Sequence, residues 1–331
     1  IQSREVQLES RPVGLPSSEN FALLAVDLPP LQPGQMLVRN RYMSVDPYMR
    51  GRMVDRKSYV PPFQLGEPMT GGAIGEVVES NDGPYAVGTF VQSMLGWREA
   101  FVGDGSGLSP VDPDLAPLPA YLGVMGMPGM TAYVGLLDIG QPQAGETVYV
   151  SGAAGAVGSI VCQIAKLRDC HVVGSAGSDE KVQWLLDVAG VDAAFNYKRV
   201  PVAAGLARSC RAGIDVFFDN VGGETLEAAL GRMNDFGRVV ACGAIAQYNA
   251  TEPVPGPRNL GLIVPRRLTL RGFIVSDHAD RMPDFHRDMS EWVAAGQIRW
   301  EETILEGIEQ SVPAFLGIFS GENLGIMIVK L

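Results

Sequence analysis

The 331-residue sequence predicts an α/β protein with two parts, a mostly β first part and a doubly wound parallel sheet in the second. The sheet is predicted by a buried strand, a glycine-rich turn and a helix that follow one another within residues 147–167. Beyond them, apolar strands and amphipathic helices continue to alternate, which requires right-handed crossovers and parallel strands. The first part is predicted by short period-two apolar runs between proline and glycine clusters.

In the first part, these runs extend from Val6 to about Asp114 and suggest a small barrel or sandwich. Examples are residues 26–30, 35–40 and 74–80. The tail, 304–331, returns to short strands around a Gly-Glu-Asn-Leu-Gly turn, and we expect it to rejoin the first part.

An uncharged run, 115–137, is long enough to span a bilayer. Because Pro117, Pro119 and Pro128 interrupt it, we interpret it as a buried connector between the two parts and expect no membrane segment.

The second part contains six predicted strands, which suit a complete dinucleotide-binding sheet with its ligand at the carboxyl ends of the strands. Val148 to Val150 form the first strand, and helical spacing resumes from Ile160 to Leu167. The later predicted strands are 170–175, 193–197, 214–219, 238–242 and 268–275, and the later predicted helices are 179–189, a segment from the Gly222-Gly223 pair through Met233, and 283–295.

Composition limits the possible functions. A hydrophobic content of 46% and a charged content of 19% indicate a globular chain. The net charge of -11 disfavours nucleic-acid and anionic-membrane partners, which need clustered Lys and Arg. The start of the chain lacks the apolar core of a signal peptide. The four cysteines form no CxxC pair and no cluster with histidine, so we expect no metal, no disulfide and a reducing, cytoplasmic location.

The glycine-rich turn has the spacing Ala153-x-Gly155-x-x-Gly158, with alanine in place of the usual first glycine. Such a turn lets the backbone approach a pyrophosphate, and the following helix presents free N–H groups to its charge. Glycine turns also occur for structural reasons, so the motif alone is weak. Its position between a strand and a helix favours the dinucleotide site.

The end of the second strand favours NADP over NAD. An NAD site would have a lone acid there to bind the ribose hydroxyls, whereas this chain has small residues. Ser178, Lys181 and Tyr197 could instead bind a 2′-phosphate. The alternative is a surface lysine on a helix capped by Ser178. Asp179 and Glu180 count against a phosphate site unless they point away.

Tyr48 is the candidate catalytic residue, within a segment rich in Tyr, Asp and Arg at 42–53. A phenol can donate a hydrogen bond or a proton where a carbonyl must be polarised. The alternative, favoured by spacing alone, is that Asp46 and Arg50 satisfy each other while Tyr48 packs.

Taken together, these segments resemble the medium-chain dehydrogenase/reductase superfamily. Within it they are similar to the zinc-independent branch of leukotriene hydroxydehydrogenase/prostaglandin reductase, alkenal double-bond reductases and bacterial curcumin reductase. The resemblance covers nearly the whole chain and rests on the order of seven segments, each weak by itself: 45–50, 126–133, 153–158, 176–178 with Lys181, 218–223, 242–245 and 272–275.

The resemblance implies a GroES-like substrate domain at 1–122, completed by 300–331, a Rossmann NADP-binding domain at 123–299, and a cleft between them. It also implies a set of NADP-binding residues: Gly155, Ala156, Val157, Gly158, Ser178, Lys181, Tyr197, Asn220, Cys242, Gly243, Ala244, Ile245, Tyr248, Phe273, Ile274, Val275 and Asn323. Several relatives have a tyrosine before the sixth strand, where this chain has Pro265. Tyr48 is therefore the better catalytic candidate, beside the ribose hydroxyl of the cofactor.

The activity implied is NADPH-dependent reduction of the activated C=C bond of α,β-unsaturated ketones and aldehydes, by a protein expected to be a homodimer. A zinc alcohol dehydrogenase is disfavoured because its ligand set is missing. Two alternatives stay open: an NADPH quinone oxidoreductase of the same fold, and a catalytically silent NADPH-binding sensor.

Overall fold

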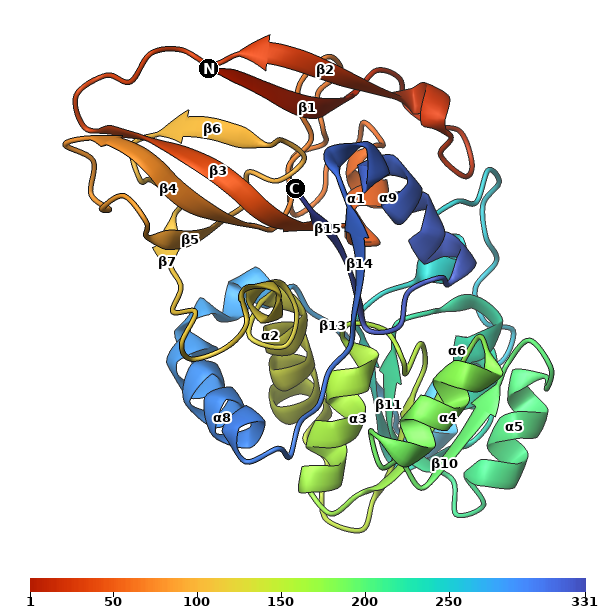
Figure 1. Ribbon diagram of the computed structural model, residues 1–331. Helices are drawn as coiled ribbons and strands as arrows, with labels where there is room; N and C mark the ends of the chain where they lie inside the picture. Colours follow the sequence, from red (N-terminus) through yellow and green to blue (C-terminus); the bar gives the residue numbers. More distant parts are fainter. The chain divides into compact units, whose positions relative to one another are not determined.

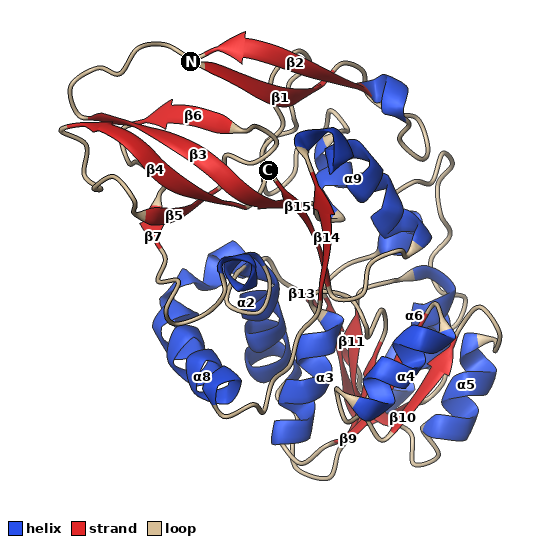
Figure 2. Cartoon of the chain, viewed as in Figure 1, coloured by secondary structure: helices blue, strands red, loops and turns tan.

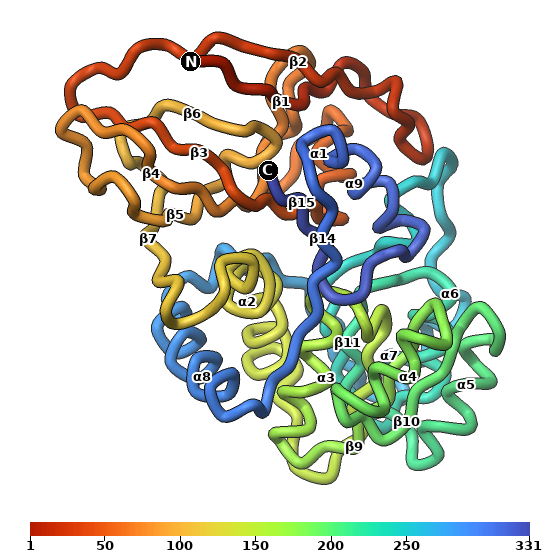
Figure 3. Tube along the Cα trace, viewed as in Figure 1, coloured from red at the N-terminus to blue at the C-terminus, as the bar shows by residue number.

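The computed structural model describes residues 1–331 and divides into two compact units. The first unit contains Ile1–Gly123 and Glu302–Leu331, and the second contains Val124–Glu301. Figure 3 traces this path, with the blue C-terminal end of the chain returning among the red and orange segments of the first unit.

The first unit is built on two sheets (Figure 1). Strands β1 (Gln2–Leu8) and β2 (Phe21–Asp27) form an antiparallel pair. The other sheet has seven strands in the order β14-β15-β3-β4-β5-β7, with β6 paired to β3. Their bounds are β3 (Gln35–Ser44), β4 (Ala73–Asn81), β5 (Phe90–Ser93), β6 (Ala100–Gly103), β7 (Ser109–Pro110), β14 (Glu302–Glu306) and β15 (Ile326–Lys330).

The predicted strands at 35–40 and 74–80 are confirmed by β3 and β4. The run at 26–30 is only partly a strand, because β2 ends at Asp27 before two prolines that have no N–H to donate. The tail rejoins this unit as expected, since β15 pairs antiparallel with β3.

The tail is not made of strands alone, and this expectation was wrong. Residues between β14 and β15 form the helix α9 (Ser311–Ser320). Ala314, Phe315 and Ile318 lie at helical spacing and are buried in the core. Pro313 is tolerated because it lies in the first turn, where its missing N–H has no intrahelical partner.

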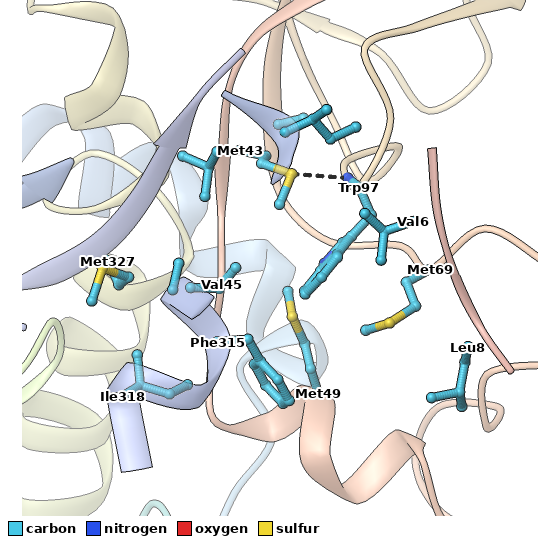
Figure 4. Close-up of a cluster of buried hydrophobic side chains, with 14 of the residues drawn as sticks. Val6, Leu8, Met43, Val45, Met49, Met69, Trp97, Phe315, Ile318 and Met327 are labelled. Atoms are coloured by element: carbon cyan, nitrogen blue, oxygen red, sulfur yellow. Dashed lines mark hydrogen bonds between the residues drawn. The ribbon is translucent and has the colours of Figure 1, made fainter. Parts of the chain in front are cut away.

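Methionine side chains and aromatic rings fill the core of the first unit (Figure 4). Met43 and Met49 lie beside Trp97, whose backbone N–H donates to the Met43 Sδ at 3.1 Å. Phe315 meets the Trp97 ring edge to face, with centroids 6.0 Å apart. Because Met49 is fully buried here, this core holds the short helix α1 (Tyr48–Arg52) in place.

The connector at 115–137 is buried as expected, and most of it is helical. It contains the 3-10 helix η2 (Leu118–Leu122), α2 (Met127–Val134) and the start of the π-helix η3 (Gly135–Gly140). Pro128 occupies the first turn of α2, where proline is favoured. Across residues 1–331, no helix combines the length and apolar character needed to cross a membrane.

The second unit contains a six-stranded parallel sheet in the order β10-β9-β8-β11-β12-β13. Strand order reverses beside β8, as in doubly wound dinucleotide folds. The predicted α/β fold class is therefore confirmed, with a β-rich part and a Rossmann-like sheet. The strands are β8 (Thr147–Val150), β9 (His171–Ala176), β10 (Ala193–Asn196), β11 (Ile214–Asp219), β12 (Met233–Ala241) and β13 (Thr269–Gly272).

Helices flank this sheet (Figure 2). They are α3 (Gly158–Leu167), α4 (Asp179–Asp187), α5 (Val202–Ser209), α6 (Gly223–Leu230), α7 (Ile263–Arg266) and α8 (Met282–Ala294). The short 3-10 helices of the chain are η1 (Ser18–Asn20), η4 (Ile245–Gln247), η5 (Leu260–Leu262), η6 (Val275–Arg281) and η7 (Ile308–Gln310).

Two predicted boundaries and one missing helix need correction. The helix after β11 ends at Leu230 rather than Met233, because β12 already begins there. The sixth strand ends at Gly272, and Val275 begins η6. The helix α5 was not predicted at all.

Candidate functional site

The glycine turn after β8 needs glycine at two positions. Gly152 has a φ of +58°, in the left-handed region that side chains disfavour. A Cβ on Gly158 would lie 2.3 Å from the Gly152 carbonyl oxygen. The start of α3 therefore packs directly on the turn, and a larger residue at 158 would force the two apart.

Three successive backbone N–H groups, those of Ala156, Val157 and Gly158, make no hydrogen bond within the chain. The N–H groups on either side of these three do have partners. Gly155 N–H donates to Gly152 O and Ser159 N–H donates to Gly155 O, each at 3.1 Å. Free N–H groups at the N-terminus of a ten-residue helix, together with its dipole, are suited to a phosphate. The four residues predicted to bind the cofactor here, Gly155 to Gly158, form this row of N–H groups and the turn that precedes it, which we call the N–H cradle.

The end of β11 is held against the end of β8 by a network around Asp219. Its Oδ1 accepts hydrogen bonds from Ser151 Oγ at 3.0 Å and from the N–H groups of Val221 and Gly222, both at 2.9 Å. Burial raises the pKa of the Asp219 carboxyl, and these hydrogen bonds counteract part of that shift. The Asn220 amide donates to Ser151 O at 2.7 Å, which fixes it beside the glycine turn.

A pocket of ≈ 560 Å³ opens at the carboxyl ends of β12 and β13. The Tyr248 hydroxyl accepts a hydrogen bond from Ala244 N–H at 3.2 Å and so closes the loop after β12 on itself. Burial raises the pKa of the Cys242 thiol to about 12, so it stays protonated at neutral pH. Ile245 and Val275 directly follow pocket residues and begin η4 and η6. The lining comprises Ala241, Cys242, Gly243, Ala244, Tyr248, Gly272, Phe273, Ile274 and Asp277.

Ser178, Lys181 and Tyr197 lie together at the carboxyl ends of β9 and β10. Ser178 is the N-cap of α4, and its Oγ accepts from Lys181 N–H at 3.3 Å. A Cβ on Gly177 would lie 2.8 Å from the Tyr197 hydroxyl, which places this phenol over the turn before the cap.

Of the two acids that counted against a phosphate here, Asp179 is occupied by other partners, whereas the charge of Glu180 reaches Lys181. Asp179 pairs with Arg199 at 2.6 Å and accepts from the Asn196 amide at 2.7 Å. The pKa of Lys181 is lowered, first by burial and then by the nearby charge of Lys198, and the charge of Glu180 offsets part of that shift. Two ammonium groups that repel each other across this site favour an anion between them. Two residues near the site were not predicted from the sequence: Lys198, which no motif marks, and Asp277 in the pocket.

The remaining two predicted residues belong to the first unit. Tyr48 is the first residue of α1, and its hydroxyl is buried without a hydrogen-bond partner. Burial and the charge of Asp46 raise the pKa of this phenol. Asn323 donates from its side-chain amide to Gly325 O at 2.7 Å and so stabilises the turn before β15.

Asp46 and Arg50, which the sequence suggested could satisfy each other, both form hydrogen bonds to other residues. Asp46 accepts from the Ser44 hydroxyl at 2.7 Å. Arg50 donates to the carbonyl oxygens of Pro12 and Gly14, at 3.3 and 2.8 Å. The Tyr48 hydroxyl is buried and meets no partner in hydrogen-bond geometry, which costs about 1–3 kcal/mol unless a ligand bonds it.

Two family models match the chain. One, described as the N-terminal domain of oxidoreductase, matches residues 4–111, and the other, described as zinc-binding dehydrogenase, matches residues 156–294. Despite the second description, no group of three or more His, Cys, Asp or Glu side chains is gathered that could hold a metal ion.

Similar proteins match over the full length of the chain. NADPH-dependent curcumin reductase from Escherichia coli is 42% identical over 100% of this chain and 97% of its own length. Prostaglandin reductase 1 from Rattus norvegicus is 43% identical, with coverage of 100% and 99%. The crystal structure of CurA from Vibrio vulnificus in complex with NADPH superposes with a TM-score of 0.94 at 43% identity, covering 99% of this chain and 98% of that one.

Proposed function

This chain belongs to the zinc-independent branch of the medium-chain dehydrogenase/reductase superfamily, and on that premise we propose that it reduces activated C=C bonds with NADPH. Its substrates are α,β-unsaturated ketones and aldehydes, the class that includes the conjugated enone curcumin. The observation that carries the proposal is the row of three free N–H groups at the start of α3, in a chain similar over its full length to NADPH-dependent reductases.

The residues of the second unit divide into three groups along the cofactor. The N–H groups at 156–158 bind the pyrophosphate, and Gly155 allows its close approach. Ser178, Lys181 and Tyr197 bind the 2′-phosphate. Asn220 and the pocket residues at 242–245, 248 and 273–275 surround the nicotinamide half. From the first unit, Asn323 completes the set.

Bound NADPH supplies the hydride, which the β-carbon of the substrate accepts. Negative charge then builds on the carbonyl oxygen, and a hydrogen-bond donor aimed at that oxygen stabilises it by several kcal/mol. Tyr48 is our candidate donor because its hydroxyl is buried and unpaired. Pro265, at the position where the family resemblance leads one to expect a tyrosine, has no proton to give. Protonation of the α-carbon, by water or Tyr48, yields the saturated ketone or aldehyde.

The experiment measures NADPH consumption against linear enones, aromatic enones and quinones, with mass analysis of each product. Loss of the double bond with the carbonyl intact is the expected result. Turnover of quinones alone would instead favour the quinone oxidoreductase. Tight NADPH binding without turnover of any member would favour the sensor.

Two further expectations belong to this proposal. The homodimer is supported by β13, an edge strand whose residues are all exposed and available to a second copy. The cytoplasm is supported by four free thiols, those of Cys162, Cys170, Cys210 and Cys242. Fractionation of cells that express the protein would test the location.

A further inference from the structure

Arg52 is the last residue of α1, four positions after Tyr48. Residues four apart share a face of a helix, with their Cβ atoms about 5–6 Å apart. Arg52 is not among the site residues predicted from the sequence, and the chemistry proposed above does not use it. Its position on the same face as the unpaired phenol is what singles it out.

Three contacts fix the Arg52 guanidinium. Nη1 donates to the Thr70 hydroxyl at 2.9 Å, and Nε donates to the Pro61 carbonyl oxygen at 3.1 Å. The guanidinium carbon lies 4.1 Å from the centre of the Phe63 ring, a cation–π contact. None of these partners is a carboxylate, so the contacts orient the group and leave its positive charge unneutralised.

The groups that face Tyr48 differ in sign. Burial raises the pKa of the phenol most, the charges of Asp46 and Tyr59 raise it further, and the charge of Arg52 lowers it. Asp46 is buried and accepts a hydrogen bond from Ser44. Arg52 is the cation, held in place by its own contacts, that acts on the phenol. A cation there stabilises negative charge that reaches the phenol oxygen as it donates toward an enolate.

We propose that Arg52 is a positioning residue for the reduction, acting through Tyr48: its anchored charge makes the Tyr48 hydroxyl a stronger donor to the substrate oxygen. This inference rests on the proposed function and assigns it a residue outside the cofactor set. Because the charge acts where the transition state is negative, its loss should lower kcat and leave KM and NADPH affinity nearly unchanged.

The test is a double-mutant cycle between Tyr48→Phe and Arg52→Met, with enone reduction as the readout. We expect Arg52→Met to lower kcat about tenfold, as a change of one pKa unit in the donor would. Arg52→Lys, which keeps the charge, should restore most of the loss. In the Tyr48→Phe background, Arg52→Met should cost nothing further, since the residue through which it acts is gone.

Arg11→Met is the matched control. Arg11 donates to the carbonyl oxygens of Met53 and Phe63, at 3.1 and 3.2 Å, so it anchors the same segment without facing Tyr48. Its loss should leave kcat within about twofold. Equal losses in Arg11→Met and Arg52→Met would overturn the proposal and show that loop order alone matters.

Other outcomes separate this inference from the proposed function. If Arg52→Met costs as much in the Tyr48→Phe background as in the wild type, Arg52 acts independently and the inference is wrong. If Tyr48→Phe itself leaves kcat unchanged, the Tyr48 assignment fails and the inference with it. If the wild type reduces no enone C=C bond, the proposed function fails. Thermal unfolding of each variant confirms that the compared proteins are folded.

Discussion

Asp46 is a carboxyl with 5% of its surface exposed and one side-chain hydrogen bond, from Ser44. Burial raises its pKa from 3.8 to about 6. No sequence pattern reports such a shift, because it depends on what packs around the carboxyl rather than on its neighbours in the chain. The same holds for the unpaired Tyr48 hydroxyl and for Arg52, whereas Lys181 and Tyr197 were predictable from their position after a strand.

The raised pKa of Asp46 predicts how stability changes with pH. The folded state binds this proton more tightly than the unfolded state, so the contribution of Asp46 is greatest below pH 4 and is lost as pH rises through 6. The expected loss is roughly 2–3 kcal/mol. Chemical denaturation from pH 4 to pH 8 should show this fall in wild type and a smaller one in Asp46→Asn. Equal slopes would contradict the assignment.

Lys181 should determine preference for the phosphorylated cofactor. Replacing Lys181 with Met removes a charge-assisted contact worth about 1.5–3 kcal/mol, so affinity for 2′,5′-ADP should fall by about ten- to a hundredfold. Affinity for 5′-AMP, which lacks the 2′-phosphate, should not change. Lys166→Met is the control, because Lys166 pairs with Asp192 at 2.8 Å and is not part of this site. Titration calorimetry measures the affinities of the wild type and of both variants for the two ligands.

At the scale of elements, strands were easier to predict than helices. β8 and β11 are short apolar runs, fully or almost fully buried, and their position is evident from hydrophobicity alone. α5 was missed because its four alanine and glycine positions out of eight give little apolar periodicity. α9 was missed because it is apolar on nearly every side and contains Pro313. In both helices, packing against the core overrides a weak local signal.

The glycine turn is the element with the sharpest prediction. Gly158→Ala places a methyl group against the Gly152 carbonyl and should displace the N–H cradle. We expect binding of NADPH and of 2′,5′-ADP to weaken by about tenfold or more, since both need the phosphate contacts. Gly261→Ala is the matched control, because a Cβ there meets nothing within 4 Å. Unchanged binding in Gly158→Ala would show that the cradle does not hold the cofactor.

At the scale of the whole molecule, the order of the segments carried more information than any one of them. Each glycine or proline motif could be explained by local structure alone. The order in which the motifs follow one another along the chain nevertheless matched a family and predicted the topology of the sheet. What the order could not give was the state of individual side chains, such as the partners of Asp179 and the contacts of Arg52. Those follow from tertiary packing, which one sequence does not display.

Assembly is predicted at this scale as well. Light scattering with size-exclusion chromatography should give about twice the 35.4 kDa of one chain. Leu270→Pro, on the exposed edge strand β13, removes a backbone donor and should shift the protein toward the monomer. A wild-type mass near 35.4 kDa would contradict the homodimer.

The reaction itself is tested most directly with NADPH that carries deuterium on the transferred position of the nicotinamide, supplied with a neutral enone. The position of deuterium in the product is then determined by NMR. We predict a saturated ketone with deuterium on the β-carbon and an intact carbonyl group. Deuterium on the carbonyl carbon of an alcohol would contradict C=C reduction and identify the enzyme as a carbonyl reductase.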